Sequence, residues 1–310
     1  GNPDGGHVLY VGTARGVARV VDDRVELLSA LDDSAPVSVT ALCETESTDG
    51  VRALWVGTQA GLLRRDGDSW RRFTTADGLP SNLVRCIATT LMPNGVPSLC
   101  VGTTEGLGLY SDGAWTTVDR ASGLPDQSVI SLLADPISGR THLLFMGTTT
   151  GLVRWELDAW RVVDASDGLP SSNIYSILES VSAQGNRAML VGTDAGLARH
   201  EQGRWKLVDV PTDLPSSRIL ALCETGPVEG PRTLWVGTTA GLARNDGGRW
   251  TRFDKSSGLP DSGIRCITEG RDDNGASELW VGTYGGAARL SNGEWSSWTV
   301  RDGLPSNGVL

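Results

Sequence analysis

A unit of 45 residues is repeated seven times along the chain, and this repeat restricts the possible folds more than any other feature. Every copy carries the triplet Val-Gly-Thr or Met-Gly-Thr, and the spacing between successive triplets never changes. The glycines of the seven triplets are Gly12, Gly57, Gly102, Gly147, Gly192, Gly237 and Gly282. Fixed self-similarity at about 40–50 residues is typical of β-propeller blades and of helical solenoids. The local chemistry of one copy decides between these two classes.

The second copy has the pattern of four short strands. Residues 54–56 form an apolar run that ends at a Gly-Thr turn, and residues 61–64 form the second run. The Asp-Gly pair at 66–67 predicts a hairpin into a third strand at 70–73. Residues 84–88 are apolar on both parities, as expected for a strand that is buried on both faces. Each repeat therefore predicts a four-stranded antiparallel sheet.

Such a sheet cannot bury both of its faces alone, so seven sheets are expected to pack face to face in a ring. The sequence predicts an all-β fold, a seven-bladed β-propeller that forms a single domain over residues 1–310. The last residues, 303–310, begin another strand of the buried type, whereas the first copy has none before residue 9. We therefore expect the N- and C-terminal strands to pair and close the ring.

Tryptophan is abundant, with 11 residues in the chain, and most of it belongs to the repeat. One repeat position holds tryptophan in six copies and Val25 in the first. The six are Trp70, Trp115, Trp160, Trp205, Trp250 and Trp295. Burying an indole removes roughly 150–250 Å² from water. We expect these side chains to pack between blades rather than to form an aromatic cage for a ligand.

The charge balance excludes several partners. The chain has 27 basic and 37 acidic residues, a net charge of −10, and no basic run. Nucleic acid is not expected as a partner, because phosphate binding requires clustered lysine and arginine. The apolar runs have the length of strands, so no membrane insertion of this segment is expected. The repeats satisfy one another within one chain, and we expect a monomer.

The five cysteines fit a buried structural role. Cys43 and Cys223 share one repeat position, and Cys86 and Cys266 share another, all on the buried strand. We interpret them as small core residues, since no Cys-x-x-Cys pair suggests metal or redox chemistry. Free thiols favour a reducing compartment such as the cytoplasm.

The phrase LWVGTTAGLARNDGGRWTRFDKSSGLPDSGIRCI, residues 234–267, resembles the two-component regulator propeller repeat. The hallmark of that family is a W-x-G-T-x-x-G-L strand pair followed by D-G-L-P-x-N, and the resemblance covers essentially the whole chain. It implies a bacterial ligand-sensing domain of a hybrid sensor kinase, acting in signal transduction from an extracytoplasmic, periplasmic position. Because the free thiols favour the cytoplasm, the compartment stays open.

Residues repeated in every copy are expected to serve the fold, whereas a ligand needs groups that differ among copies. Propeller connectivity places the turn after each Val-Gly-Thr triplet and the loop after each Gly-Leu-Pro on one face, at the mouth of the central channel. The candidate ligand-binding residues in the first turn are Arg15, Gln59, Glu105, Thr150, Asp194, Thr239 and Tyr284. Those in the second loop are Asn82, Gln127, Asn173, Arg218 and Asn307.

No residue pattern predicts catalysis, a metal site or a cofactor. The three histidines, His7, His142 and His200, are isolated from one another in the sequence. Residues 272–274 lack the alternating spacing of a calcium loop, so a plain turn is expected. A Glu105–Asp194 acid/base pair for glycoside chemistry remains an open alternative.

The leading hypothesis is a non-enzymatic binding or sensor module that recognises a small extracellular molecule, such as a glycan fragment, at the channel mouth. Its occupancy would be relayed to a downstream signalling domain. The alternative is a structural or protein-interaction scaffold, a recently amplified or engineered propeller without a dedicated small ligand. A third possibility is a propeller lyase or hydrolase.

Overall fold

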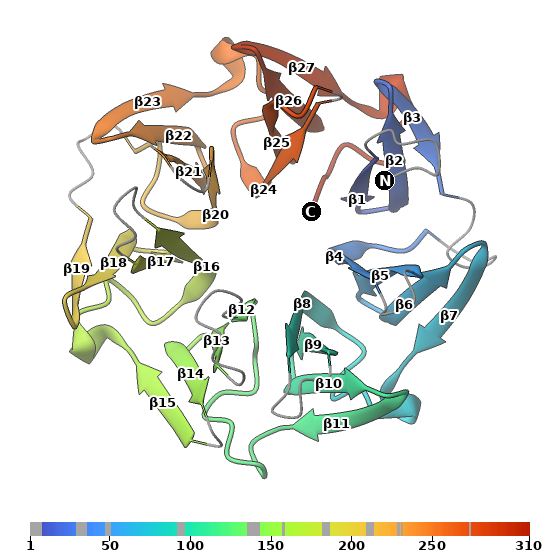
Figure 1. The fold of residues 1–310 in the computed structure, drawn as a ribbon, viewed down its shortest axis with the longest axis vertical. Helices are drawn as coiled ribbons and strands as arrows, with labels where there is room; N and C mark the ends of the chain where they lie inside the picture. Colours follow the sequence, from blue (N-terminus) through green and yellow to red (C-terminus); the bar gives the residue numbers. More distant parts are fainter. Residues whose placement is uncertain are drawn as a thin grey trace. The chain divides into compact units, whose positions relative to one another are not determined.

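The structure of the protein is a computed structural model. The structure describes residues 8–28, 36–46, 51–91, 97–134, 143–156, 159–181, 187–208, 214–227, 230, 232–272 and 274–310. In these residues the strands form one three-stranded and six four-stranded antiparallel sheets, whose strand order is drawn in Figure 1. The predicted fold class, a seven-bladed β-propeller with almost no helix, is confirmed.

The chain divides into two compact units, each described by itself. The middle unit, residues 31–177, contains the sheets β4–β7, β8–β11 and β12–β15. Its strands are β4 (Val39–Glu46), β5 (Arg52–Thr58), β6 (Gly61–Asp66), β7 (Ser69–Phe73), β8 (Val84–Leu91), β9 (Pro97–Thr103), β10 (Leu107–Ser111), β11 (Ala114–Val118), β12 (Ser131–Ala134), β13 (Leu143–Gly147), β14 (Leu152–Glu156) and β15 (Ala159–Val163).

The terminal unit, residues 1–30 and 178–310, contains the sheets β1–β3, β20–β23 and β24–β27 and most of β16–β19. The division falls inside β16 (Ile174–Val181). The other strands are β1 (Leu9–Thr13), β2 (Gly16–Val21), β3 (Arg24–Leu27), β17 (Arg187–Thr193), β18 (Leu197–Glu201), β19 (Arg204–Leu207), β20 (Ile219–Thr225), β21 (Thr233–Thr238), β22 (Gly241–Asp246), β23 (Arg249–Phe253), β24 (Ile264–Arg271), β25 (Ser277–Thr283), β26 (Ala287–Ser291) and β27 (Glu294–Trp298). That residues 1–310 form one domain stays a prediction.

The threonine of each triplet holds the first hairpin turn of its sheet. All seven threonines are fully buried, and each Oγ1 donates to the carbonyl of the glycine three residues later, at 2.6–2.8 Å. The same oxygen accepts a hydrogen bond from the amide two residues later. One buried and one partly buried hydrogen bond to the same hydroxyl fix the turn.

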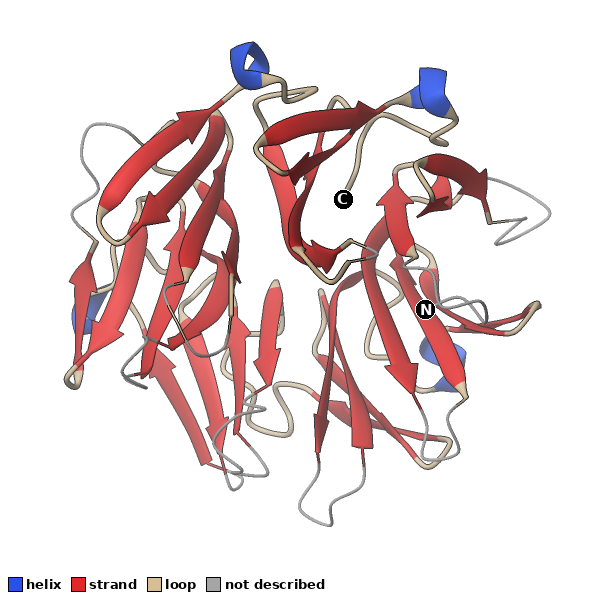
Figure 2. Ribbon diagram, turned by 45° about the horizontal axis from the view of Figure 1, so that its top comes forward, coloured by secondary structure: helices blue, strands red, loops and turns tan. Residues whose placement is uncertain are grey.

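The Asp-Gly-Leu-Pro loop contains a short helical turn that the strand pattern did not predict. Four such 3₁₀ turns, blue in Figure 2, are η1 (Thr75–Asp77), η2 (Ala165–Asp167), η3 (Lys255–Ser257) and η4 (Val300–Asp302). Each has a capping box and ends at a glycine with φ between 104° and 110°, a backbone conformation that favours glycine. At η1 this glycine is Gly78, and a Cβ added there would lie 2.9 Å from the Cβ of Trp115.

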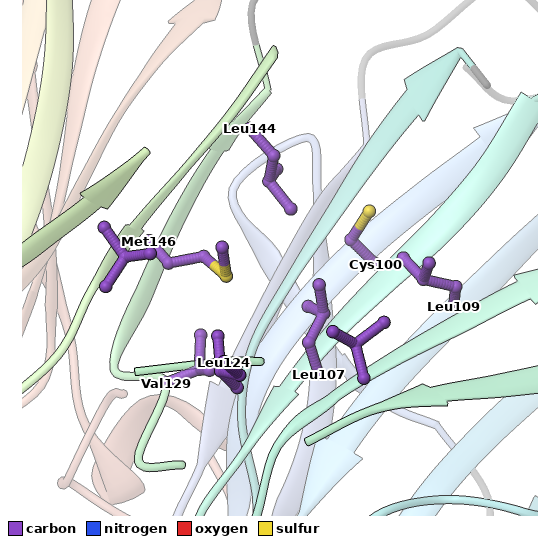
Figure 3. Packing of buried hydrophobic residues seen from close by; sticks show 9 residues of the cluster. Cys100, Leu107, Leu109, Leu124, Val129, Leu144 and Met146 are labelled. Carbon is purple, nitrogen blue, oxygen red and sulfur yellow. The ribbon is translucent and has the colours of Figure 1, made fainter. Parts of the chain in front are cut away.

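The core lies between neighbouring sheets, as the tryptophan and cysteine positions predicted. Figure 3 shows one cluster of the middle unit, in which Met146 of β13 packs with Cys100 of β9 and Leu107 of β10. All five cysteines are free. Burial raises the pKa of the Cys100 thiol to about 12 and that of Cys223 to about 11, so both are unreactive core groups.

The C-terminal residues pair with β1 inside the terminal unit. Val309 forms an antiparallel bridge with Thr13, the Ala14 amide donates to the Gly308 carbonyl at 3.1 Å, and the Leu310 amide donates to the Gly12 carbonyl at 3.0 Å. The expected pairing of the two ends is therefore present. Closure of a complete ring stays a prediction.

Candidate functional site

Four of the innermost strands have a register shift near their start, and the shift displaces one side chain in each. The displaced residues are Thr40 and Arg85 in the middle unit and Leu220 and Arg265 in the terminal unit. Bulges often re-aim a side chain next to a binding site. The sequence analysis did not single out the position of these displaced residues, although the residue type there varies among copies as much as it does at the turn positions.

In the terminal unit, the turns after the triplets contact the loops after Gly-Leu-Pro. The Thr239 hydroxyl donates to the Ser216 hydroxyl at 2.9 Å, and the Ser217 hydroxyl donates to the Asp194 carbonyl at 3.3 Å. Arg15, Thr239, Tyr284 and Arg218 are exposed, whereas Asp194 and Asn307 are half-buried. The two groups of candidate residues therefore meet at the same edge of their sheets.

The middle unit has the same arrangement. Ser81 and Thr104 share a hydroxyl–hydroxyl bond at 3.0 Å, and Asp126 accepts from the hydroxyls of Thr149 at 2.7 Å and Thr150 at 3.3 Å. The remaining candidates of this unit are also accessible. Gln59, Glu105 and Asn82 are exposed, and Gln127 and Asn173 are half-buried.

Two of the candidate asparagines have a structural role. Asn82 Oδ1 accepts from the Thr75 amide at 2.9 Å, and Asn307 Oδ1 accepts from the Val300 amide at 2.8 Å. Each bond holds the start of a 3₁₀ turn, η1 or η4. These oxygens are already used, so the side-chain NH₂ groups are what the two asparagines can offer to a ligand.

Asp126 is the most strongly hydrogen-bonded carboxylate among the turn contacts. Burial raises the pKa of Asp126, but hydrogen bonds from the Thr149 hydroxyl, the Ser128 and Thr149 amides and the Thr150 hydroxyl outweigh it and lower the pKa overall. Asp126 therefore stays ionised and links its loop to the next turn.

Tyr284 stands out among the candidates because it is a large aromatic side chain that is 53% exposed. It lies at the β25–β26 turn, beside the displaced Arg265. The Arg265 guanidinium carbon lies 5.3 Å from the centroid of the tyrosine ring, and Nη1 donates to the tyrosine hydroxyl at 3.1 Å. This aromatic–cation pair joins a predicted site residue to one that the sequence reasoning missed.

The described residues hold no group of three or more histidine, cysteine or acidic side chains that could bind a metal ion. Asp272 accepts from the amides of Asn274 and Ala276, at 2.9 and 2.7 Å, which makes a plain turn there. His200 packs against Trp205, with ring centroids 4.9 Å apart. His7 and His142 lie outside the described residues.

The hypothetical acid/base pair gains no support. Glu105 belongs to the middle unit and Asp194 to the terminal unit, so the pair stays a hypothesis. The described residues contain no helix that is long and apolar enough to span a membrane.

Comparison with known proteins gives structural likenesses only. No family model matches the chain. No curated protein matches it. Among solved structures, it is similar to the extracellular domain of a putative hybrid two-component system from B. thetaiotaomicron, with 19% identity and a TM-score of 0.69 over 92% of this chain and 37% of that one.

Two further structures are similar. The extracellular domain of a putative one-component system from B. thetaiotaomicron has 20% identity and a TM-score of 0.52, over 92% of this chain and 44% of that chain. An ancestral GH74 enzyme has 15% identity and a TM-score of 0.65, over 94% of this chain and 44% of that chain. The chain thus spans less than half the length of these structures, and what it shares with them is the β-propeller fold.

Proposed function

We propose that the chain is a non-enzymatic ligand-binding module of a signalling protein, and that it recognises a small extracellular molecule of the glycan class. The observation that carries the proposal is the contrast within each turn. A buried threonine locks the backbone in all seven copies, while the next two residues differ and reach solvent. Variable groups on a rigid frame are the usual construction of a binding surface.

Two points favour a sensor over an enzyme. Two of the similar structures are extracellular domains of a two-component and a one-component system. The groups that meet at these turns are hydroxyls in both units, the Arg265–Tyr284 pair in the terminal unit and, in the middle unit, the Asp126 carboxylate, whose pKa is lowered. The general acid of a glycoside hydrolase needs a raised pKa, so Asp126, whose pKa is lowered, does not suit that role.

The proposal is tested by calorimetry and thermal shift with a panel of neutral and acidic oligosaccharides. A saturable rise in the melting temperature with a dissociation constant in the micromolar to millimolar range supports it. The ancestral GH74 likeness makes turnover the second readout, so the same oligosaccharides are incubated with the protein and analysed for shorter products. If no oligosaccharide binds and a protein is captured instead, the interaction-scaffold alternative replaces the proposal.

A further inference from the structure

The seventh repeat combines four residues that occur together in no other copy and that lie together in space. In the other six copies, the residue directly after the triplet is Ala14, Gln59, Thr104, Thr149, Asp194 or Thr239, and only the seventh copy has an aromatic residue, Tyr284. The same copy has glycine at 263 and 285 and arginine at 265.

The two glycines provide the space that the tyrosine ring occupies. A Cβ at Gly263 would lie 2.6 Å from Cδ2 of Tyr284, and a Cβ at Gly285 would lie 2.6 Å from the carbonyl oxygen of Pro260. Real Cβ atoms essentially never approach so closely. Gly263 therefore lets the ring lie on the loop backbone, and Gly285 lets the turn approach that loop, which orders an exposed aromatic side chain.

Arg265 differs from the strand arginines of the repeat in the group that its guanidinium contacts. Arg199 and Arg244 each pair with a carboxylate of the same strand, at 3.0 and 2.7 Å. Within the described residues, Arg265 has no carboxylate at ion-pair distance, and its side chain contacts Tyr284. The nearby Asp261 does not cancel its charge, because Lys255 pairs with that carboxylate at 2.7 Å.

These observations define a site with two parts. Tyr284 exposes 53% of its surface, the Arg265 guanidinium lies over its ring, and Arg265 keeps N–H donors after giving one to the tyrosine hydroxyl. A planar guanidinium with free donors matches a carboxylate, which it can bind through two parallel bonds.

We propose that Tyr284 and Arg265 form a subsite for a sugar ring that bears a carboxylate, that is, a hexuronate. The apolar C–H face of a pyranose would stack on Tyr284 while its carboxylate bonds Arg265. An amphipathic ring suits a platform that is half exposed, because its hydroxyls stay in water, whereas a purely apolar ligand requires a pocket that surrounds most of its surface. This inference rests on the proposed function and specifies the ligand class.

The test compares digalacturonate with neutral galactobiose of the same linkage, by calorimetry at low salt with the full chain. Two variants remove the subsite with residues that other copies carry at the same positions: Tyr284→Thr, as at Thr239, and Arg265→Leu, as at Leu220. The matched control is Arg85→Leu, which removes the same charge from the same bulge position in a copy that has Thr104 in place of the tyrosine.

Digalacturonate should bind the wild-type protein, and each subsite variant should weaken it by about tenfold or more, while Arg85→Leu leaves it unchanged. Arg265→Lys should recover part of the affinity, because it restores the charge without the two-bond geometry. If both disaccharides bind equally and neither subsite variant matters, the inference is wrong and the glycan-binding proposal stands. If neither they nor any other oligosaccharide binds the folded protein, both are wrong. Loss of digalacturonate binding in Arg85→Leu alone would also overturn the inference.

Discussion

The contact between Gly78 and Trp115 permits a quantitative test of how neighbouring repeats are held together. The backbone φ at Gly78 is 110°, and an added Cβ would lie 2.9 Å from the Trp115 Cβ. Gly78→Ala therefore has two costs. The unfavourable backbone conformation costs about 1–3 kcal/mol, and the displacement of the packed indole costs about 1–3 kcal/mol more. We expect a total loss in the free energy of unfolding of about 2–6 kcal/mol.

Gly303 provides the matched control. It is the equivalent glycine at η4, and it lies against Val25, which holds the tryptophan position in the first copy. Its φ is 105°, but a Cβ there would lie 3.4 Å from the Val25 Cβ, which is an ordinary van der Waals distance. Gly303→Ala should therefore have the backbone cost alone, about 1–3 kcal/mol. The difference between the two variants isolates the packing cost.

The free energies are measured by guanidinium denaturation, with the slope compared among variants so that a change in the unfolding mechanism is detected. In the double variant Gly78→Ala/Trp115→Val, position 115 has the valine that the first repeat has at Val25, so the added Cβ no longer meets an indole. We expect a coupling of about 1–3 kcal/mol in the favourable direction. Equal losses for Gly78→Ala and Gly303→Ala, together with strict additivity in the double variant, would refute the packing argument.

Three further predictions concern other elements. Thr238→Val should lower the free energy of unfolding by about 1–3 kcal/mol in denaturation, because the Gly241 carbonyl and the Ala240 amide each lose their hydrogen bond to the Thr238 hydroxyl. An unchanged midpoint would show that the hydroxyl does not lock the turn. Deleting residues 303–310 should lower the melting temperature of the chain, since β1 loses its backbone bonds to residues 308–310, and an unaltered melting curve would contradict this. Because the folded-state pKa of Asp126 is lowered, its contribution to stability is present above the ordinary aspartate pKa of about 3.9 and is lost as pH falls through the lowered value. Asp126→Asn should thus flatten the acid side of a plot of melting temperature against pH, and parallel curves would argue against a hydrogen-bonded carboxylate.

Most of the fold could be predicted from the sequence because residues with the same structural role recur at the same position in several copies. The strand at 84–88 was expected to be buried on both faces, and this is correct only for Val84, which is fully buried. Arg85 is exposed, and residues 86–88 are half-buried. The turn threonines were expected to serve the fold, and Thr103 is fully buried with both its bonds made. A feature that each repeat needs for its own packing appears in each repeat, so the pattern alone identifies it.

The candidate site could be predicted only in part. The turn and loop positions follow from connectivity, which is why Tyr284 was among the expected residues. Arg265 was missed because a strand pattern assigns alternate residues to opposite faces, and a bulge breaks that alternation without a signal in hydrophobicity. The structural role of Asn82 was also hidden, since its bond to the Thr75 amide depends on a 3₁₀ turn that the strand pattern does not contain.

The regular repeat offers a test of whether the proposed hexuronate subsite is sufficient as well as necessary. The copy with Arg85 has the same bulge, between Val84 and Cys86, and lacks only the other three residues of the subsite. We expect the triple variant Leu83→Gly/Thr104→Tyr/Glu105→Gly to create a second subsite, because the two glycines give the new ring the space it needs and the arginine is already in place. Calorimetry with digalacturonate should then give two equivalents per chain in place of one.

Thr104→Tyr alone is the control. It should keep one equivalent, because this copy has the side chains of Leu83 and Glu105 at the positions where the seventh copy has Gly263 and Gly285. A folded triple variant that still binds one equivalent would mean that the four residues do not by themselves make the subsite.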